Sequence, residues 1–317
     1  MEIRNARIET DLPDIVRIIN PYETDPVSVD QVRSFFQYNP PGRTQLRLVA
    51  ADENDRVAGY SGLIHEASAP VGHFITWVIV DPTLRRRGTG SALWDAMLSR
   101  LKGKAAVRLE ADVSDNDPIG LGFAQRRGFS IHHHIFRSNL SLTTFDEAPY
   151  LPMIAAIKAQ GICFRSLADF PDTSETRHKL YDLNAINELE IPNHEGNFSG
   201  YSEFKKYVFG APWFRKEGQL LAVDGDRWVG LAAVRLAPET QSAYNLHTGV
   251  LRLYRGRKIA QALKIMAVCY ARQHAAQSIV TDNDSLNAPI LAINRKMGYQ
   301  PQPGKYGLVR WLREDNA

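Results

Sequence analysis

Apolar residues recur at spacings of three and four near the start of each half of the chain, which predicts an amphipathic helix in each. These segments are LPDIVRIINPY from Leu12 and RHKLYDLNAINEL from Arg177. Two strand-like segments follow each helix and are joined by turn residues, at Asn54-Asp55 and at Asp224-Gly225-Asp226. Each half is therefore expected to open with a helix and a β-hairpin.

A third, β-branched strand comes next, HFITWVIV from His73 and YNLHTGVL from Tyr244. A loop with arginine and glycine then leads into a long amphipathic helix, SALWDAMLSRLKG in the first half and QALKIMAVCYARQHA in the second. A strand, a short helix and a final strand complete each half. This order predicts a mixed α/β fold, with a mixed twisted sheet flanked by helices in each half.

The two halves are copies at a constant spacing of 170 residues, for example 255 minus 85. The matched pairs are Val80 and Val250, Arg85 and Arg255, Gly90 and Ala260, Gly128 and Gly298, and Phe129 and Tyr299. We expect a first domain at 1–142, a linker helix at 143–159 and a second domain at 160–317. Because the linker gives the copies a high effective concentration, they are expected to pack as a pseudo-twofold monomer.

Composition excludes several classes of protein. The hydrophobic fraction of 44% and charged fraction of 23% are those of a folded globular chain. A net charge of +3 over 317 residues gives no support to a general nucleic-acid or membrane-surface partner. The two cysteines lack metal-site spacing, and no segment reads as a signal peptide or a membrane span. A cytoplasmic protein is expected.

A candidate anion site lies in VDPTLRRRGTGSAL, which runs from Val80 to Leu93. Glycines at 88 and 90 permit positive φ angles, and the amide groups of a helix beginning at Ser91 would point at a phosphate. A plain turn with solvated arginines is the alternative. The second copy, LRLYRGRKIAQAL, occupies the same place in the repeat and favours the ligand site.

The run Arg85-Arg86-Arg87-Gly88-Thr89-Gly90 matches the [Q/R]-x-x-G-x-[G/A] loop of the GNAT superfamily of acyl-CoA-dependent N-acetyltransferases. The chain resembles a tandem GNAT protein, of the two-domain kind that includes mycothiol synthase. The resemblance is strongest over Phe74 to Phe129 and Tyr244 to Tyr299. It implies acetyl-CoA as the acyl donor and a primary amine as the acceptor.

The resemblance also implies which residues bind acetyl-CoA. Backbone groups near the end of the third strand would pair with the pantetheine arm, at Val78, Val80, Thr248 and Val250. The loop and helix start would hold the pyrophosphate, through Arg85, Arg86, Arg87, Gly88, Thr89, Gly90 and Ser91 in the first copy and Arg255, Gly256, Arg257, Lys258, Ile259, Ala260 and Gln261 in the second. An asparagine of the family is Asn287 in the second copy and Asp117 in the first.

Two departures from the family pattern affect the predicted sites, and the first of them predicts unequal copies. Lys258 replaces the first loop glycine, so the first copy is expected to bind acetyl-CoA more tightly. The tyrosine that often protonates the leaving thiolate is Ala124 in one copy and Asn294 in the other. Tyr244 is the candidate catalytic residue, with lining of the acceptor pocket as its alternative role.

His132, His133 and His134 do not predict a metal site, because alternate residues of a strand face opposite ways. No metal is expected. The acceptor stays open between a polyamine-like molecule, an amino sugar, an antibiotic and a peptide N-terminus. The alternative function is an acyl-CoA-binding regulatory protein in which one or both copies have lost catalysis.

Overall fold

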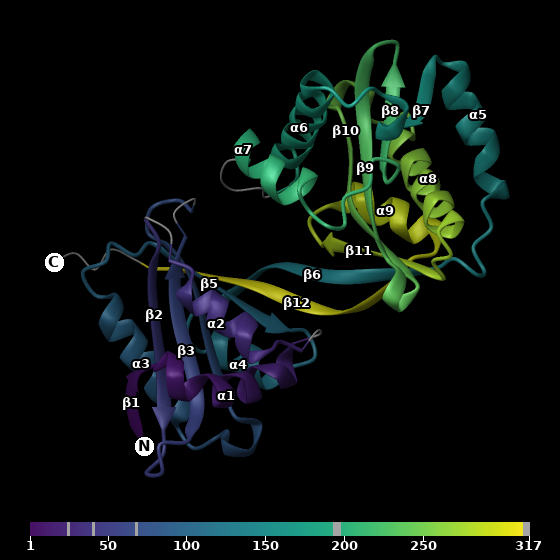
Figure 1. Cartoon of the computed structure of the whole chain (residues 1–317). Coiled ribbons are helices and arrows are strands. Elements are labelled where there is room, and N and C mark those ends of the chain that lie inside the picture. Colours follow the sequence, from purple (N-terminus) through teal and green to yellow (C-terminus); the bar gives the residue numbers. More distant parts are fainter. Residues whose placement is uncertain (24–25, 40–41, 67–68, 193–197, 313–317) are drawn as a thin grey trace. The chain divides into compact units, whose positions relative to one another are not determined.

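The computed structural model describes residues 1–317 except 24–25, 40–41, 67–68, 193–197 and 313–317, and it divides into two compact units (Figure 1). Unit 1 comprises Met1–His133 and the C-terminal residues from Lys305, and unit 2 comprises His134–Gly304. The expected mixed α/β architecture is confirmed in both. The 170-residue offset holds for whole elements, because α3 begins at Thr89 and α8 begins at Ile259.

The sheet of unit 1 has the strand order β1-β2-β3-β4-β5-β12. Neighbouring strands are antiparallel except β4 and β5, which are parallel. The strands are β1 (Glu2–Asn5), β2 (Thr44–Ala51), β3 (Val57–His65), β4 (His73–Val80), β5 (Arg108–Ser114) and β12 (Gln300–Trp311). The helices are α1 (Ile8–Ile19), α2 (Val29–Gln37), α3 (Thr89–Leu101) and α4 (Pro118–Gln125).

Alternation along the strands of unit 1 builds a core on each face of its sheet. Leu48 and Ala50 pack with Leu93 and Met97 of α3, whereas Val49, between them on β2, packs with Leu12 and other residues of α1 and α2. The sheet therefore separates an α3 face from an α1–α2 face.

Unit 2 repeats this arrangement with the strand order β6-β11-β10-β9-β8-β7, in which β10 and β11 are parallel. Its strands are β6 (Ser130–Ser141), β7 (Ile162–Ser166), β8 (Gln219–Asp224), β9 (Arg227–Ala237), β10 (Ser242–Val250) and β11 (Ser278–Asp284). Its helices are α5 (Leu151–Ala159), α6 (Ser174–Leu189), α7 (Tyr201–Phe204), α8 (Ile259–Gln273) and α9 (Ala288–Met297). Side chains of α8 pack on one face of the sheet and those of α6 on the other.

The compact units divide the chain differently from the consecutive domains expected from the sequence. Residues 134–142, expected in the first domain, lie in unit 2, where β6 pairs with β11 from Ser141↔Ser278 to Ile135↔Asp284. The C-terminal strand, expected in the second domain, pairs with β5 of unit 1 from Lys305↔Ser114 to Trp311↔Arg108. Each copy thus completes its sheet with the last strand of the other copy.

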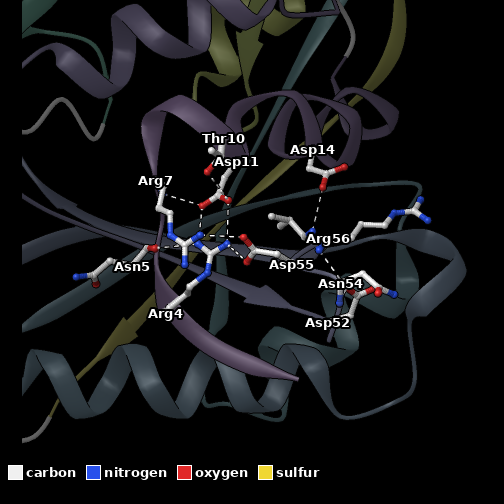
Figure 2. A network of polar contacts seen from close by, with 11 residues as sticks. Arg4, Asn5, Arg7, Thr10, Asp11, Asp14, Asp52, Asn54, Asp55 and Arg56 are labelled. Atoms are coloured by element: carbon white, nitrogen blue, oxygen red, sulfur yellow. Dashed lines mark hydrogen bonds and ion pairs between the residues drawn. The ribbon is translucent and has the colours of Figure 1, made fainter.

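Figure 2 shows a polar network that fixes the start of α1. Arg4 of β1 is 9% exposed and donates to both carboxylate oxygens of Asp11, at 2.7 and 3.0 Å. It also donates to Asp55 in the β2–β3 turn at 2.6 Å. Asp11 accepts the backbone N–H of Arg7 at 2.7 Å. The network therefore ties β1 and the β2–β3 turn to α1, whose last residue, Ile19, lines the cavity of unit 1.

Candidate active site

The two parallel strands of unit 1 diverge and leave a cleft. Their recorded register runs from His73↔Arg108 to Ile75↔Glu110, although β4 continues to Val80 and β5 to Ser114. A cavity of about 1090 Å³ lies along this divergence and reaches from the arginine-rich loop to α1 and α2. Backbone groups on the open edge of β4 are therefore placed to pair with an extended ligand.

The loop before α3 forms an anion cradle at one end of the cavity. Gly88, the N-cap residue, has a φ of 86° and gives the helix no side-chain cap. By contrast, Asp117 caps α4 by accepting the N–H of Gly120 at 2.9 Å. The first amides of α3 are thus left for a ligand, and the helix dipole favours a negative one. A Cβ on Gly88 would meet no atom within 4 Å, so the cradle is open.

The three loop arginines have different positions. Arg85 lines the cavity and donates to the Tyr22 hydroxyl and, at 3.2 Å, to Asp117. Arg86 lines the cavity with a φ of 65°, whereas Arg87 is exposed and does not line it. Arg85 and Arg86 therefore place positive charge beside the cradle.

The other predicted cofactor residues of the first copy surround the same cradle. Val78, Val80, Gly90 and Ser91 line the cavity. Thr89 also lines it but is buried, and its hydroxyl lies 3.6 Å from the Met1 sulfur. The carbonyl of Val80 already accepts a hydrogen bond from Tyr22 at 3.3 Å, which leaves that group less available to a ligand.

Arg127 is a cradle residue that the sequence reasoning missed. It lines the cavity, donates to the Ser91 hydroxyl at 2.8 Å and stacks over the Phe123 ring at 3.5 Å. Burial lowers the pKa of its guanidinium, which stays charged at neutral pH. Its signal in the sequence was its position directly before Gly128 and Phe129, which were used only to align the two copies.

The Asp112 side chain faces the cavity from the face of β5 that is turned away from α3. Leu109, Ala111 and Val113 pack toward the α3 core, so alternation turns Asp112 to the α1–α2 face. Desolvation raises the pKa of Asp112 above its usual value, and Lys305 and His133 lower it in part. The backbone of Asp112 pairs with β12 opposite Gly307, whereas among the described residues no hydrogen bond or ion pair of its carboxyl group is observed. This carboxyl group is the candidate proton acceptor of the site.

The two other acidic side chains near this end of the cavity are already paired. Glu23 lies 3.5 Å from Lys305 of β12, and Glu66 lies 3.0 Å from the buried guanidinium of Arg43. The oxygens of an ion-paired carboxylate are already engaged by the partner cation and are less available to a ligand. Asp112 is therefore distinguished from Glu23 and Glu66 by its environment.

The loop of unit 2 keeps the backbone shape of the first loop. Lys258 adopts a φ of 63° where Gly88 has 86°, and Gly256 has 78° where Arg86 has 65°. The loop arginines are held within the unit, Arg255 by Glu190 and by the Val250 carbonyl at 3.0 Å, and Arg257 by Gln160 at 3.1 Å. Lys258 is exposed.

The other predicted residues of the second copy are less accessible. Val250, Ile259 and Gln261 are buried, and Thr248 donates to Asn245 at 3.0 Å. Ala260 is half-buried. Asn287 caps α9 by accepting the N–H of Ile290 at 3.4 Å, as Asp117 caps α4. The aligned pair Asp117 and Asn287 thus shares a structural role.

Buried polar residues line the cleft of unit 2. Four lining residues of the first cavity, Thr76, Trp94, Val113 and Ala124, correspond to Asn245, Lys264, Asn283 and Asn294. These four polar residues are each at most 4% exposed. Lys264 donates to Asn245 at 2.8 Å, and Asn294 donates to Asn283 at 2.6 Å. The cleft between β10 and β11 therefore contains a hydrogen-bonded polar network that the first copy lacks.

Tyr244, the candidate catalytic residue, donates its hydroxyl proton to Asp282. Burial and this carboxylate raise the pKa of Tyr244 to about 12. A phenol with a raised pKa is a poorer base at neutral pH than an ordinary tyrosine. This geometry therefore disfavours Tyr244 as the general base.

Two searches of the described residues found nothing further. No group of three or more His, Cys, Asp or Glu side chains in that part of the chain is arranged to hold a metal ion. No described helix is both long and apolar enough to cross a membrane.

The comparisons with known proteins agree with this geometry. Residues 12–129 match the acetyltransferase (GNAT) family. A mycothiol acetyltransferase of Acidothermus cellulolyticus is 24% identical over 269 residues, which cover 80% of this chain and 76% of that protein. The structure of a GCN5-related N-acetyltransferase from Sphaerobacter thermophilus matches with a TM-score of 0.68 and 18% identity. The match covers 98% of this chain and 96% of that chain. A tandem GNAT protein from the clavulanic acid biosynthesis pathway covers 98% of both chains, with a TM-score of 0.67 and 19% identity.

The fold and the cradle of unit 1, together with these matches, define an enzyme of the GNAT N-acetyltransferase type. The chain as a whole has the fold of a tandem GNAT protein, with one copy of the fold in each unit.

Proposed function

We propose that unit 1 transfers the acetyl group of acetyl-CoA to a primary amine. The observation that carries the proposal is a single cavity that joins an uncapped helix N-terminus at one end to the carboxyl group of Asp112. The amides of α3, with Arg86 and Arg127, hold the pyrophosphate. The open edge of β4 holds the pantetheine arm, which directs the thioester toward Asp112.

Bound acetyl-CoA supplies a thioester carbonyl carbon for the amine nitrogen to attack. The new C–N bond forms as the C–S bond breaks, and Asp112 accepts the proton that the amine loses. The leaving thiolate needs little help from an acid, because a thiol has a pKa near 8.5. This fits the presence of Ala124 where relatives often have a tyrosine. Assaying CoA thiol release from acetyl-CoA against a panel of amines tests the proposal directly.

The buried polar network of unit 2 supports the alternative function for that copy alone. Buried Lys264 and Asn294 occupy positions where the first cavity is lined by Trp94 and Ala124. We therefore expect calorimetric titration with CoA to give about one tight site per chain, because a ligand would have to displace a buried polar network from unit 2. Two sites of equal affinity would contradict this assignment.

Replacing Gly88 by valine is expected to weaken CoA binding by about ten- to a hundredfold, because a β-branched residue at this positive φ strains the loop by about 1–3 kcal/mol. Calorimetry measures the affinity. Gly225→Val is the matched control, since Gly225 also has a positive φ and open space around its Cβ position but lies in the β8–β9 turn. If Gly88→Val and Gly225→Val bound CoA with equal affinity, the assignment of the Gly88 loop as the phosphate site would be wrong.

A further inference from the structure

The Asp112 end of the cavity is walled by apolar side chains. Phe35 of α2 and Ile75 of β4 line it and are 45% and 49% exposed. Ile75 precedes Val80 by five positions, which places it about 16 Å from the loop at 3.3 Å per residue. Exposed apolar surface inside a cavity is stabilised by an apolar ligand. This wall therefore fits the body of an acceptor and not the phosphates of a donor.

A glycine makes room for the aromatic part of the wall. Gly62 of β3 lies directly opposite Trp77 of β4, and a Cβ on Gly62 would lie 1.9 Å from the indole ring. The indole therefore lies flat across β3, where it packs on Tyr60 with ring centroids 5.7 Å apart. Flat aromatic surface facing a cavity binds planar apolar groups well.

Of the acidic side chains in this region, one is available to bind the ammonium group of the acceptor. Glu23 is paired with Lys305, and Glu66 is paired with Arg43. Within the described part of the cavity lining, Asp112 is the carboxylate near this wall that has neither an ion pair nor a capping role. One available carboxylate matches one ammonium group, whereas a polyamine would bring a second cation with no counter-charge.

We propose that the acceptor is a primary monoamine whose single ammonium group is carried on an apolar body of aromatic size. This assignment rests on the proposed acetyl transfer. It selects against a polyamine, an amino sugar and a polar peptide N-terminus. Hydroxyl groups of a sugar would face Phe35, Ile75 and Trp77, which offer them few hydrogen bonds and leave them desolvated.

The test compares 2-phenylethylamine with putrescine, glucosamine and a polar tetrapeptide, with thiol release from acetyl-CoA as the readout. We expect kcat/KM for 2-phenylethylamine to exceed the others by about tenfold or more, as desolvated polar groups weaken binding. If CoA is released with a polar amine in preference, the acceptor assignment fails and acetyl transfer stands. If CoA binds but no amine releases thiol, acetyl transfer fails as well.

A binding experiment separates the acceptor wall from catalysis. Titration of 2-phenylethylamine into the protein saturated with CoA is expected to show about tenfold weaker binding in Phe35→Ala, with the affinity for CoA unchanged. Tyr207→Ala is the matched control, because Tyr207 is an exposed aromatic residue of unit 2. Gly62→Ala, which must displace the Trp77 indole, is expected to weaken amine binding likewise. Unchanged amine affinity in both Phe35→Ala and Gly62→Ala would overturn the proposal.

Discussion

Replacing Asp112 by asparagine is expected to lower kcat/KM for the amine by about 10²- to 10⁴-fold, the usual contribution of a positioned general base. The affinity for CoA should not change, because Asp112 lies on the α1–α2 face and the cradle is built by α3 and Arg127. Thiol release and CoA calorimetry measure the two quantities separately. Asp95→Asn is the matched control, since Asp95 of α3 lines the same cavity.

The pH dependence of kcat/KM should also report the protonation of Asp112. Since desolvation raises the pKa of Asp112, wild-type kcat/KM should fall as pH drops through that raised value and the base becomes protonated. The titratable groups that act on Asp112 are Lys305 of β12 and His133 of β6, and Lys305 is itself paired with Glu23. In Asp112→Asn the acid limb of the profile should disappear.

Stability separates a catalytic role of Asp112 from a structural one. A carboxyl group whose pKa is raised in the folded state contributes stability below its unfolded pKa and loses it as pH rises. Asp112→Asn should therefore leave the thermal midpoint at pH 7 unchanged or higher. An Asp112→Asn protein that was both less stable and less active would indicate a structural residue and contradict the assignment.

The repeat and the cradle could be predicted from the sequence because both depend on local pattern. The 170-residue offset carried over to α3 and α8 and to their preceding strands. The Gly88 loop could be recognised because a positive φ favours glycine and a helix start favours particular residue types. The exchange of β6 and β12 has no comparable local signal in the sequence. Which sheet each of these strands joins depends on pairing over a long sequence separation, which the local pattern of a strand does not specify.

Asp112 and Lys264 show why the chemistry of the two clefts was harder to predict. Asp112 in RLEADVS reads as the solvent side of a half-buried strand, and only the divergence of β4 from β5 turns that side into a cavity wall. Lys264 lies in a run of apolar residues, Ala262, Leu263, Ile265, Ala267 and Val268, all of which are buried. A helix that is apolar all round is expected in a core. That pattern was the signal for a buried lysine, and the sequence reasoning did not use it.

Replacing Lys264 by methionine is expected to stabilise the protein at pH 7 and to flatten the rise of its stability toward pH 10. Burial lowers the pKa of Lys264 to about 7 from 10.5. Between these values the unfolded chain binds a proton that the folded protein does not, so the free energy of unfolding increases with pH. A shift of this size sets an upper limit of about 5 kcal/mol on the increase, at about 1.4 kcal/mol per pKa unit.

Methionine is the suitable replacement, because it matches the lysine stem in length and needs no hydrogen bond. Asn245, which accepts from Lys264 at 2.8 Å, keeps the hydrogen bond from Thr248 at 3.0 Å. Neighbouring groups do not titrate between pH 7 and 10. Burial lowers the pKa of His247 to about 4 and raises that of Tyr299, whose ring lies 4.9 Å from the Lys264 ammonium.

Urea unfolding of the wild type and Lys264→Met at several pH values between 7 and 10 measures this effect as the difference between their midpoints. Lys296→Met is the matched control, since Lys296 of α9 is exposed and should give a difference that does not change with pH. The Lys264→Met difference should be largest at pH 7 and shrink as the wild-type lysine no longer has to lose a proton on folding. A constant difference across this range would mean that Lys264 folds as a cation, held by Asn245 and the ring of Tyr299.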